Sequence, residues 1–191
     1  MRRLGICIAA VVVLTGCQRK ADTKPLDQAG VRFTVIEKLH EMKVSDNEVA
    51  QVVKAREAGL HDENCLELVR IARSRGGEFA AGDAVQTLAG VQFTEEEVMV
   101  LARQNQLGLW VGEVQAMRFA GVNKPVIMAL ATARSKGRPA ISGPNIVRLQ
   151  DAGFTDNEMM ALIDEGTTDA QAAALARGRL PRGPAQFRRL R

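Results

Sequence analysis

The sequence has few of the side chains that build metal sites and disulfide bonds. Among its 191 residues are 3 cysteines, 2 histidines, 1 tryptophan and no tyrosine. His40 and His61 have no cysteine or carboxylate at a spacing typical of zinc ligands. We find no Ser-His-Asp set, phosphate-binding loop or dinucleotide-binding fingerprint. The sequence therefore predicts no metal, no cofactor and no catalytic residues, and it favours a function other than catalysis.

Long hydrophobic runs are also missing, apart from one near the N-terminus. Residues 4–14 form an apolar run of about 11 residues. This run is too short to cross a bilayer, since a spanning helix needs ~20 apolar residues. Arg2 and Arg3 precede the run, and it ends in Leu14-Thr15-Gly16-Cys17. A basic start, a short apolar run and small residues before a cysteine resemble the export signal and lipobox of bacterial lipoproteins.

This resemblance implies that Cys17 is lipidated and that residues 1–16 are removed. In lipoproteins the cysteine thiol receives a diacylglycerol, the new amino group is usually acylated, and lipid alone anchors the chain in the cell envelope. Gln18 follows the cysteine instead of aspartate. In Gram-negative lipoproteins that resembles the default for the outer membrane, with the protein facing the periplasm. The alternative is an ordinary secretory peptide with a chance cysteine.

The remaining cysteines give no internal disulfide bond. Cys7 leaves with the signal and Cys17 is blocked by lipid, so Cys65 has no partner within the chain. Cys65 occupies a position that other helices fill with apolar residues. We expect it to be a buried core thiol, with a redox role as the alternative.

Positive charge is concentrated at the two ends of the chain. The formal net charge is +4, but Arg2 and Arg3 lie in the signal, and residues 171–191 contribute six arginines and no acid. The remainder, residues 17–170, therefore has a net charge of −4. An acidic body on an exported chain argues against nucleic-acid binding.

An internal repeat is the second strong signal in the sequence. Residues 72–76 (Ala-Arg-Ser-Arg-Gly) match residues 133–137 (Ala-Arg-Ser-Lys-Gly) at an offset of 61, and the match continues without a gap from residues 93–99 to 154–160. A second register, at an offset of 49, relates residues 44–49 to 93–98. The shared element reads Leu-x-x-Ala-Gly, an apolar residue, Ser or Thr, and then acids.

This element is typical of a joint between two helices. Glycine ends one helix in the left-handed conformation, Ser or Thr caps the next, and acids in its first turn complement the helix dipole. We expect joints around Val44, Leu60, Phe93, Leu109, Val122 and Phe154. Lys43 and Gln92 replace the glycine at two of them, which predicts less ideal joints there. For the acidic run Glu95–Glu97, a cation site is the alternative to a dipole role.

Apolar residues between the joints follow helical spacing throughout. The pattern predicts an all-α chain with about nine short helices from Thr34 to Glu165, and a tenth from the Thr168 cap to about Arg177. We expect a compact helical-repeat bundle or a short α-solenoid. The predicted organisation is a signal peptide (1–16), a tether (17–33), a helical repeat domain (34–166), and a short helix with an arginine-rich flexible tail (167–191). The body resembles repeats of uncharacterised exported bacterial proteins, which implies a fold and no activity.

Two features are candidates for partner binding. Leu109 and Trp110 lie in an apolar run at a position where the other joints hold capping residues, so Trp110 is either a local packing residue or an exposed anchor for a partner. The tail carries Arg182, Arg188 and Arg189, which are suited to anionic lipids or polymers, although a solvated tail is the alternative.

These observations lead to three hypotheses about function. The preferred one is a lipid-anchored envelope protein whose helices form an interaction or scaffolding module for an envelope protein. The second is an enzyme or small-ligand binder that uses a cleft between helical units. The third is a tail-mediated binder of anionic envelope polymers or lipids. The sequence does not predict the oligomeric state.

Overall fold

The computed structural model describes residues 21–108 and 111–179, and these form eleven α-helices and no strand. The predicted all-α class is confirmed. The nine helices expected from Thr34 to Glu165 correspond to α2–α10, and the tenth corresponds to α11. The helices are α1 (Lys24–Gln28), α2 (Phe33–Glu41), α3 (Asp46–Glu57), α4 (Asp62–Ser74), α5 (Gly82–Gly90), α6 (Glu95–Arg103), α7 (Val111–Phe119), α8 (Lys124–Ser135), α9 (Gly143–Asp151), α10 (Asp156–Asp164) and α11 (Asp169–Gly178).

Helix α1 differs from the expectation for this part of the chain, because residues 17–33 were expected to form a tether. The helix has five residues, and its Leu26 is fully buried. Val31, just after the helix, is 3 % exposed and belongs to the same core. A single turn with one apolar side chain shows no periodicity, so its sequence gives no helical signal.

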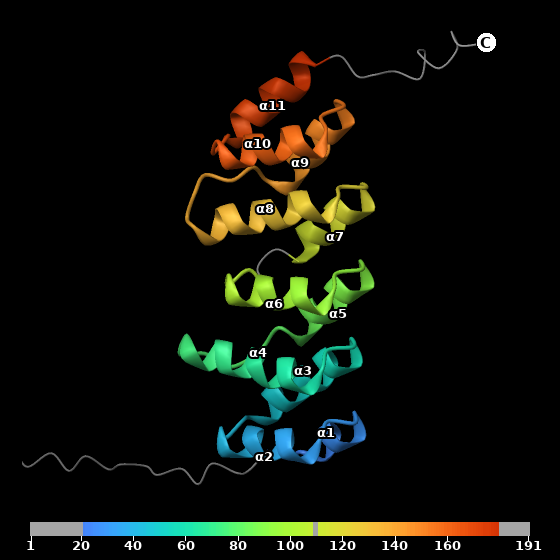
Figure 1. Ribbon diagram of the computed structural model, residues 1–191, viewed down its shortest axis with the longest axis vertical. Helices are drawn as coiled ribbons and strands as arrows, with labels where there is room; N and C mark the ends of the chain where they lie inside the picture. The colour runs from blue at the N-terminus through green and yellow to red at the C-terminus, as the bar shows by residue number, and fades with distance from the viewer. Residues whose placement is uncertain (1–20, 109–110, 180–191) are drawn as a thin grey trace, which may run out of the picture.

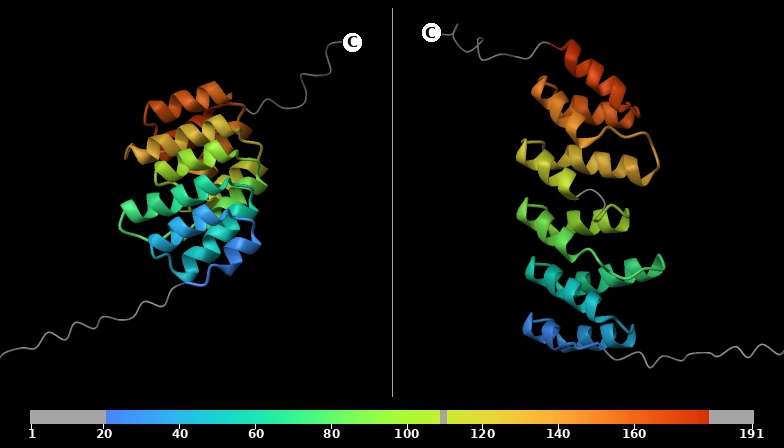
Figure 2. Two further views of the ribbon diagram at one scale, coloured as in Figure 1. Left: turned by 60° about the horizontal axis from the view of Figure 1, so that its bottom comes forward. Right: turned by 180° about the vertical axis from the view of Figure 1, so that it is seen from behind.

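The helices stack in chain order as two layers (Figures 1 and 2). Odd-numbered helices pack on odd-numbered neighbours, as α3 does on α5 and α9 on α11, and even-numbered helices pack on even-numbered ones, as α8 does on α10. Short amphipathic helices bury their apolar faces only by packing on one another. Here each helix packs on its neighbours within its own layer, and the two layers share one core. The chain ascends along the long axis from α1 to α11.

One continuous apolar core runs through the stack, from Leu26 in α1 to Ala172 in α11. Cys65 is fully buried in this core, as expected for a core thiol. Burial, strengthened by the nearby Asp62 carboxylate, raises the pKa of the Cys65 thiol to about 12. At neutral pH the sulfur is therefore a thiol, which is a poor nucleophile.

The joints have the predicted geometry. Gly59, Gly108 and Gly121 all have positive φ angles, and so do the two residues that replace glycine, Lys43 at 52° and Gln92 at 68°. Capping boxes form at four of the expected caps. These caps are Ser45, Thr94, Thr155 and Thr168.

The first-turn acids also join successive helices of one layer. Asp62 of α4 accepts a hydrogen bond from the main-chain N–H of Arg32, which caps α2, at 2.9 Å. Glu95 of α6 accepts one from the main-chain N–H of His61, which caps α4, at 2.6 Å. The acids therefore lie in the first turns, as the dipole interpretation predicts, and they also stabilise the stacking of successive even-numbered helices.

Candidate binding groove

The residues that the sequence singled out for binding lie outside the part of the chain that the structure describes. They are Cys17, Leu109, Trp110, Arg182, Arg188 and Arg189. The structure therefore does not test these predictions. It does describe Gly108 and Val111, which flank Leu109 and Trp110 in the sequence, and both line the groove described next.

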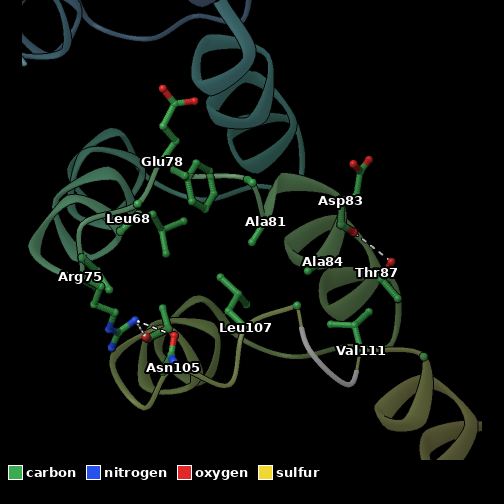
Figure 3. Close-up of a pocket in the computed structure, with 18 residues that line it drawn as sticks. Leu68, Arg75, Glu78, Ala81, Asp83, Ala84, Thr87, Asn105, Leu107 and Val111 are labelled. Atoms are coloured by element: carbon green, nitrogen blue, oxygen red, sulfur yellow. Dashed lines mark hydrogen bonds between the residues drawn. The ribbon is translucent and has the colours of Figure 1, made fainter. Parts of the chain in front are cut away.

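The groove lies between the α4–α5 loop on one side and residues 105–108 and the start of α7 on the other (Figure 3). Its volume is about 720 Å³. Leu68 and Leu107 point into it from opposite sides, while the carboxylates of Glu78 and Asp83 point outward. Leu68 and Leu107 therefore give the groove an apolar floor, polar surface makes up much of the remaining lining, and acidic groups lie at the rim.

Side chains of α3 hydrogen-bond to the α4–α5 loop, residues 75–81, and to the first residue of α5. The buried Glu48 carboxylate accepts the main-chain N–H of Phe79 at 3.1 Å and also binds the Arg73 guanidinium. The Gln51 side chain accepts the main-chain N–H of Gly82 at 2.7 Å. These bonds fix both ends of the segment that forms one wall, and they keep the Phe79 ring buried.

Arg75 connects this loop to the opposite wall. Its guanidinium donates to the main-chain carbonyls of Ala102 and Arg103 at 2.9 Å and 2.8 Å, and to the Asn105 side chain at 3.3 Å (Figure 3). The two carbonyls belong to the C-terminal turn of α6, where main-chain carbonyls have no N–H partner within the helix. Arg75 thus spans the groove at one end and sets the separation of its walls.

The polar side chains of the groove are already engaged by neighbours. Glu78 accepts from the Ser45 hydroxyl at 3.0 Å, Asp83 accepts from Lys54 Nζ at 2.7 Å, and the Thr87 hydroxyl donates to the Asp83 carbonyl at 2.9 Å. The geometry is that of a surface that receives apolar groups.

Main-chain donors in the loop are available to a ligand. The N–H groups of Glu78, Ala80 and Ala81 have no hydrogen-bond partner among the described residues. Glu78 and Ala80 are exposed to solvent. A ligand that carries carbonyl oxygens at peptide spacing finds complementary donors at this edge.

Elsewhere in the described residues, the titratable groups serve the fold. Burial raises the pKa of Glu95, but hydrogen bonds from Asn64 and His61 outweigh burial and hold that pKa below its ordinary value. No group of three or more histidine, cysteine and carboxylate side chains in the described ranges is placed to hold a metal ion. Glu95 therefore has a stacking role between α4 and α6.

Sequence reasoning missed the groove because its two walls come from different turns of the stack, residues 68–87 on one side and residues 102–108 with 111–112 on the other, and only their packing brings them together. The one available signal was proximity, since Trp110 lies beside Val111, which lines the groove. Comparison with known proteins adds nothing to this picture. No protein-family model, no curated protein and no solved structure matches the chain.

Proposed function

We propose that the chain is a lipid-anchored bacterial envelope protein that works as a helical interaction module. The proposed anchor is the lipid on Cys17, exposed by removal of residues 1–16. Its support is the order of basic, apolar and small residues before that cysteine. No helix in residues 21–108 and 111–179 is long and apolar enough to cross a membrane. The proposed location is the envelope, on the periplasmic side of the outer membrane if the organism is Gram-negative.

We further propose that the body is a helical-repeat solenoid with a period of two helix pairs. Helices α5 and α9 begin 61 residues apart, at Gly82 and Gly143. Each of these glycines donates its main-chain N–H to a side chain of the helix two positions earlier, Gln51 of α3 and Glu113 of α7. The offset found in the sequence therefore relates equivalent contacts. Repeats of this kind present extended surfaces for partners.

The observation that carries the proposed function is the groove between the α4–α5 loop and α7. We propose that its ligand is an extended peptide segment of another envelope protein, with apolar side chains and a neutral or positive charge. The apolar floor at Leu68 and Leu107 takes the side chains, and the free N–H groups of Ala80 and Ala81 take main-chain carbonyls. The net charge of −4 over residues 17–170 disfavours an acidic segment.

A small-molecule ligand is the second candidate for the same groove. The volume of about 720 Å³ falls in the range of small-ligand pockets, roughly 300–1,000 Å³. Such sites orient their ligands through a few convergent polar side chains. In this groove Arg75, Asp83 and Thr87 are occupied by structural hydrogen bonds, which favours a peptide.

The lipid anchor is tested by metabolic labelling with an alkyne analogue of palmitate. We expect labelling and membrane association in the wild-type chain and in the Cys65→Ala variant. Both should be lost in the Cys17→Ala variant, because no other cysteine remains beside the cleavage site. A Cys17→Ala protein that stays membrane-bound and equally processed contradicts the anchor.

The groove is tested by crosslinking in cells followed by affinity purification. Ala80→Arg places a long cationic side chain in the groove, while Ala116→Arg makes the same change at an exposed position of α7 that does not line it. We expect one protein partner to be lost with Ala80→Arg and Trp110→Ala and kept with Ala116→Arg. Loss only after truncation at Arg177 contradicts the groove and favours binding of anionic polymers by the tail.

A further inference from the structure

The even-numbered layer ends one helix earlier than the odd-numbered layer, because no helix of the described residues follows α11. Each even-numbered helix from α2 to α8 is followed by another that packs on it, but the described residues contain no further even-numbered helix to pack on α10. A second groove, with a volume of about 830 Å³, lies at this position between α10 and α11. We call it the terminal groove.

The terminal groove has an apolar lining. Phe154 and Leu162 contribute from the α10 side, and Leu175 contributes from α11. Leu175 is 41 % exposed, and only three other large hydrophobic side chains in the described residues are counted as exposed. Exposed leucine beside half-buried leucine and phenylalanine is typical of a surface that another segment covers.

The chain leaves α11 at the edge of this groove. Arg179, the last described residue, donates to Glu158 Oε1 at 2.7 Å, and its guanidinium carbon lies 4.0 Å from the centroid of the Phe154 ring. Both partners belong to α10 or to the joint before it. The described chain therefore ends at Arg179, within the lining of the terminal groove.

The sequence that follows is complementary to this end of the stack. Residues 156–179 contain five acids and two arginines, whereas residues 180–191 contain four arginines and no acid. The two segments therefore carry net charges of −3 and +4, which attract each other.

The same twelve residues also have the length and pattern of a covering segment. Helices α6 and α10 need nine residues each. In the sequence, Gly183-Pro184 precedes Phe187 and Leu190, two apolar residues three apart. Helix α9 likewise begins with glycine and proline and then buries two apolar residues three apart, Ile146 and Leu149.

We propose that residues 180–191 bind in the terminal groove and cover α10 and α11, with Phe187 and Leu190 on the apolar lining and the arginines beside the acids. The segment takes the place of an even-numbered helix after α11, which the stack lacks at its end, as capping segments do in repeat proteins. The inference does not rest on the proposed partner-binding function. It makes the tail a structural part of the fold, and anionic polymers then compete for the same arginines.

Hydrogen exchange on the full chain and on a form truncated after Arg179 tests this proposal. We expect the main-chain amides of α10 and α11 to exchange about tenfold faster after truncation, because local opening of these helices becomes easier. The Phe187→Ser, Leu190→Ser double variant should show the same change. The Ala185→Ser, Gln186→Ser control should not, and the amides of α3 serve as an internal reference.

A synthetic peptide of residues 180–191 separates the remaining outcomes. Added to the truncated form, it should restore the slow exchange of α10 and α11, and Leu175→Ser in the truncated form should weaken this effect. Equal exchange rates in the full and truncated chains overturn the proposal. Exchange that instead slows with protein concentration, in both forms alike, also overturns it and identifies a second copy of the chain as the occupant.

Discussion

The Glu48 carboxylate is fully buried beneath the guanidinium of Arg73, which reaches it from the last turn of α4. Glu48 also accepts the main-chain N–H groups of Ser45 and Phe79, both at 3.1 Å. One side chain thus closes the capping box of α3 and fixes the loop that forms a wall of the binding groove.

Removing Arg73 leaves Glu48 buried without its charge partner. Breaking a buried pair in this way costs ~3–5 kcal/mol. Because the Arg73 side chain is 36 % exposed, we expect Arg73→Ala to lower the free energy of unfolding by about 3 kcal/mol. The control is Arg70→Ala on the same helix, whose exposed pair with Glu67 should be worth less than ~1 kcal/mol. Urea unfolding measures the free energy of unfolding of both variants. Equal losses would contradict a stabilising role for the buried Arg73–Glu48 pair.

The close approach of Gly82 to α3 requires the absence of a side chain. A Cβ at this position would lie 2.9 Å from both the Cα and the side-chain oxygen of Gln51. We expect Gly82→Ala to destabilise the chain by ~1–3 kcal/mol through overpacking. Gly90, the last residue of the same helix, has open space around it, so Gly90→Ala should be neutral or stabilising by up to ~1 kcal/mol. The thermal unfolding midpoint should therefore fall in Gly82→Ala and stay the same or rise in Gly90→Ala, and an equal fall in both contradicts the prediction.

The left-handed conformations of Lys43 and Gln92 are strained positions that glycine relieves. A side chain in this region costs ~1–2 kcal/mol, of which glycine returns part as extra freedom in the unfolded chain. We expect Lys43→Gly and Gln92→Gly each to stabilise the chain by ~0.5–1 kcal/mol. Gly59→Ala, at a φ of 98°, should do the reverse. Glycine variants that are less stable than the wild type contradict this account.

Acid should weaken the contact between the end of α11 and the start of α10. Hydrogen bonds from Arg179 and Thr155 lower the pKa of Glu158 from 4.5 to about 2. A folded-state pKa below the unfolded value gives stability that is complete above about pH 4.5 and is lost as the pH falls toward 2. Urea unfolding of wild type and Glu158→Gln should therefore differ more at pH 7 than at pH 2.5. Glu41→Gln, an exposed acid on α2, is the control, and a gap between wild type and Glu158→Gln that does not change with pH contradicts the prediction.

The local structure of the joints was predictable because it depends on short-range chemistry. Glycine or its replacement at Lys43 and Gln92, followed by a cap such as Thr94, fixes where one helix ends and the next begins. Helix α1 was missed because one turn with only Leu26 facing the core has no period to detect. The start of the folded body was therefore placed about ten residues too late.

The groove and the buried contacts of Glu48 were not predictable from the sequence. Glu48 looks like any first-turn acid, and only the packing of α4 and the α4–α5 loop on α3 gives it Arg73 and Phe79 as partners. Such contacts join residues about 25 to 31 apart, beyond the reach of helix and turn patterns. The binding candidates chosen from the sequence, Trp110 and the tail arginines, lie outside the described residues and stay predictions.

Site-specific photocrosslinking in cells tests the central claim, that the groove binds a peptide segment of a partner protein. A photoreactive amino acid is placed at Ala80 in the groove or at Ala116 outside it. The account predicts a defined crosslinked band from position 80 that is missing from position 116, with the crosslinked fragments mapping to one apolar, neutral or basic segment of a single protein. No band from position 80, or the same band from both positions, contradicts the account.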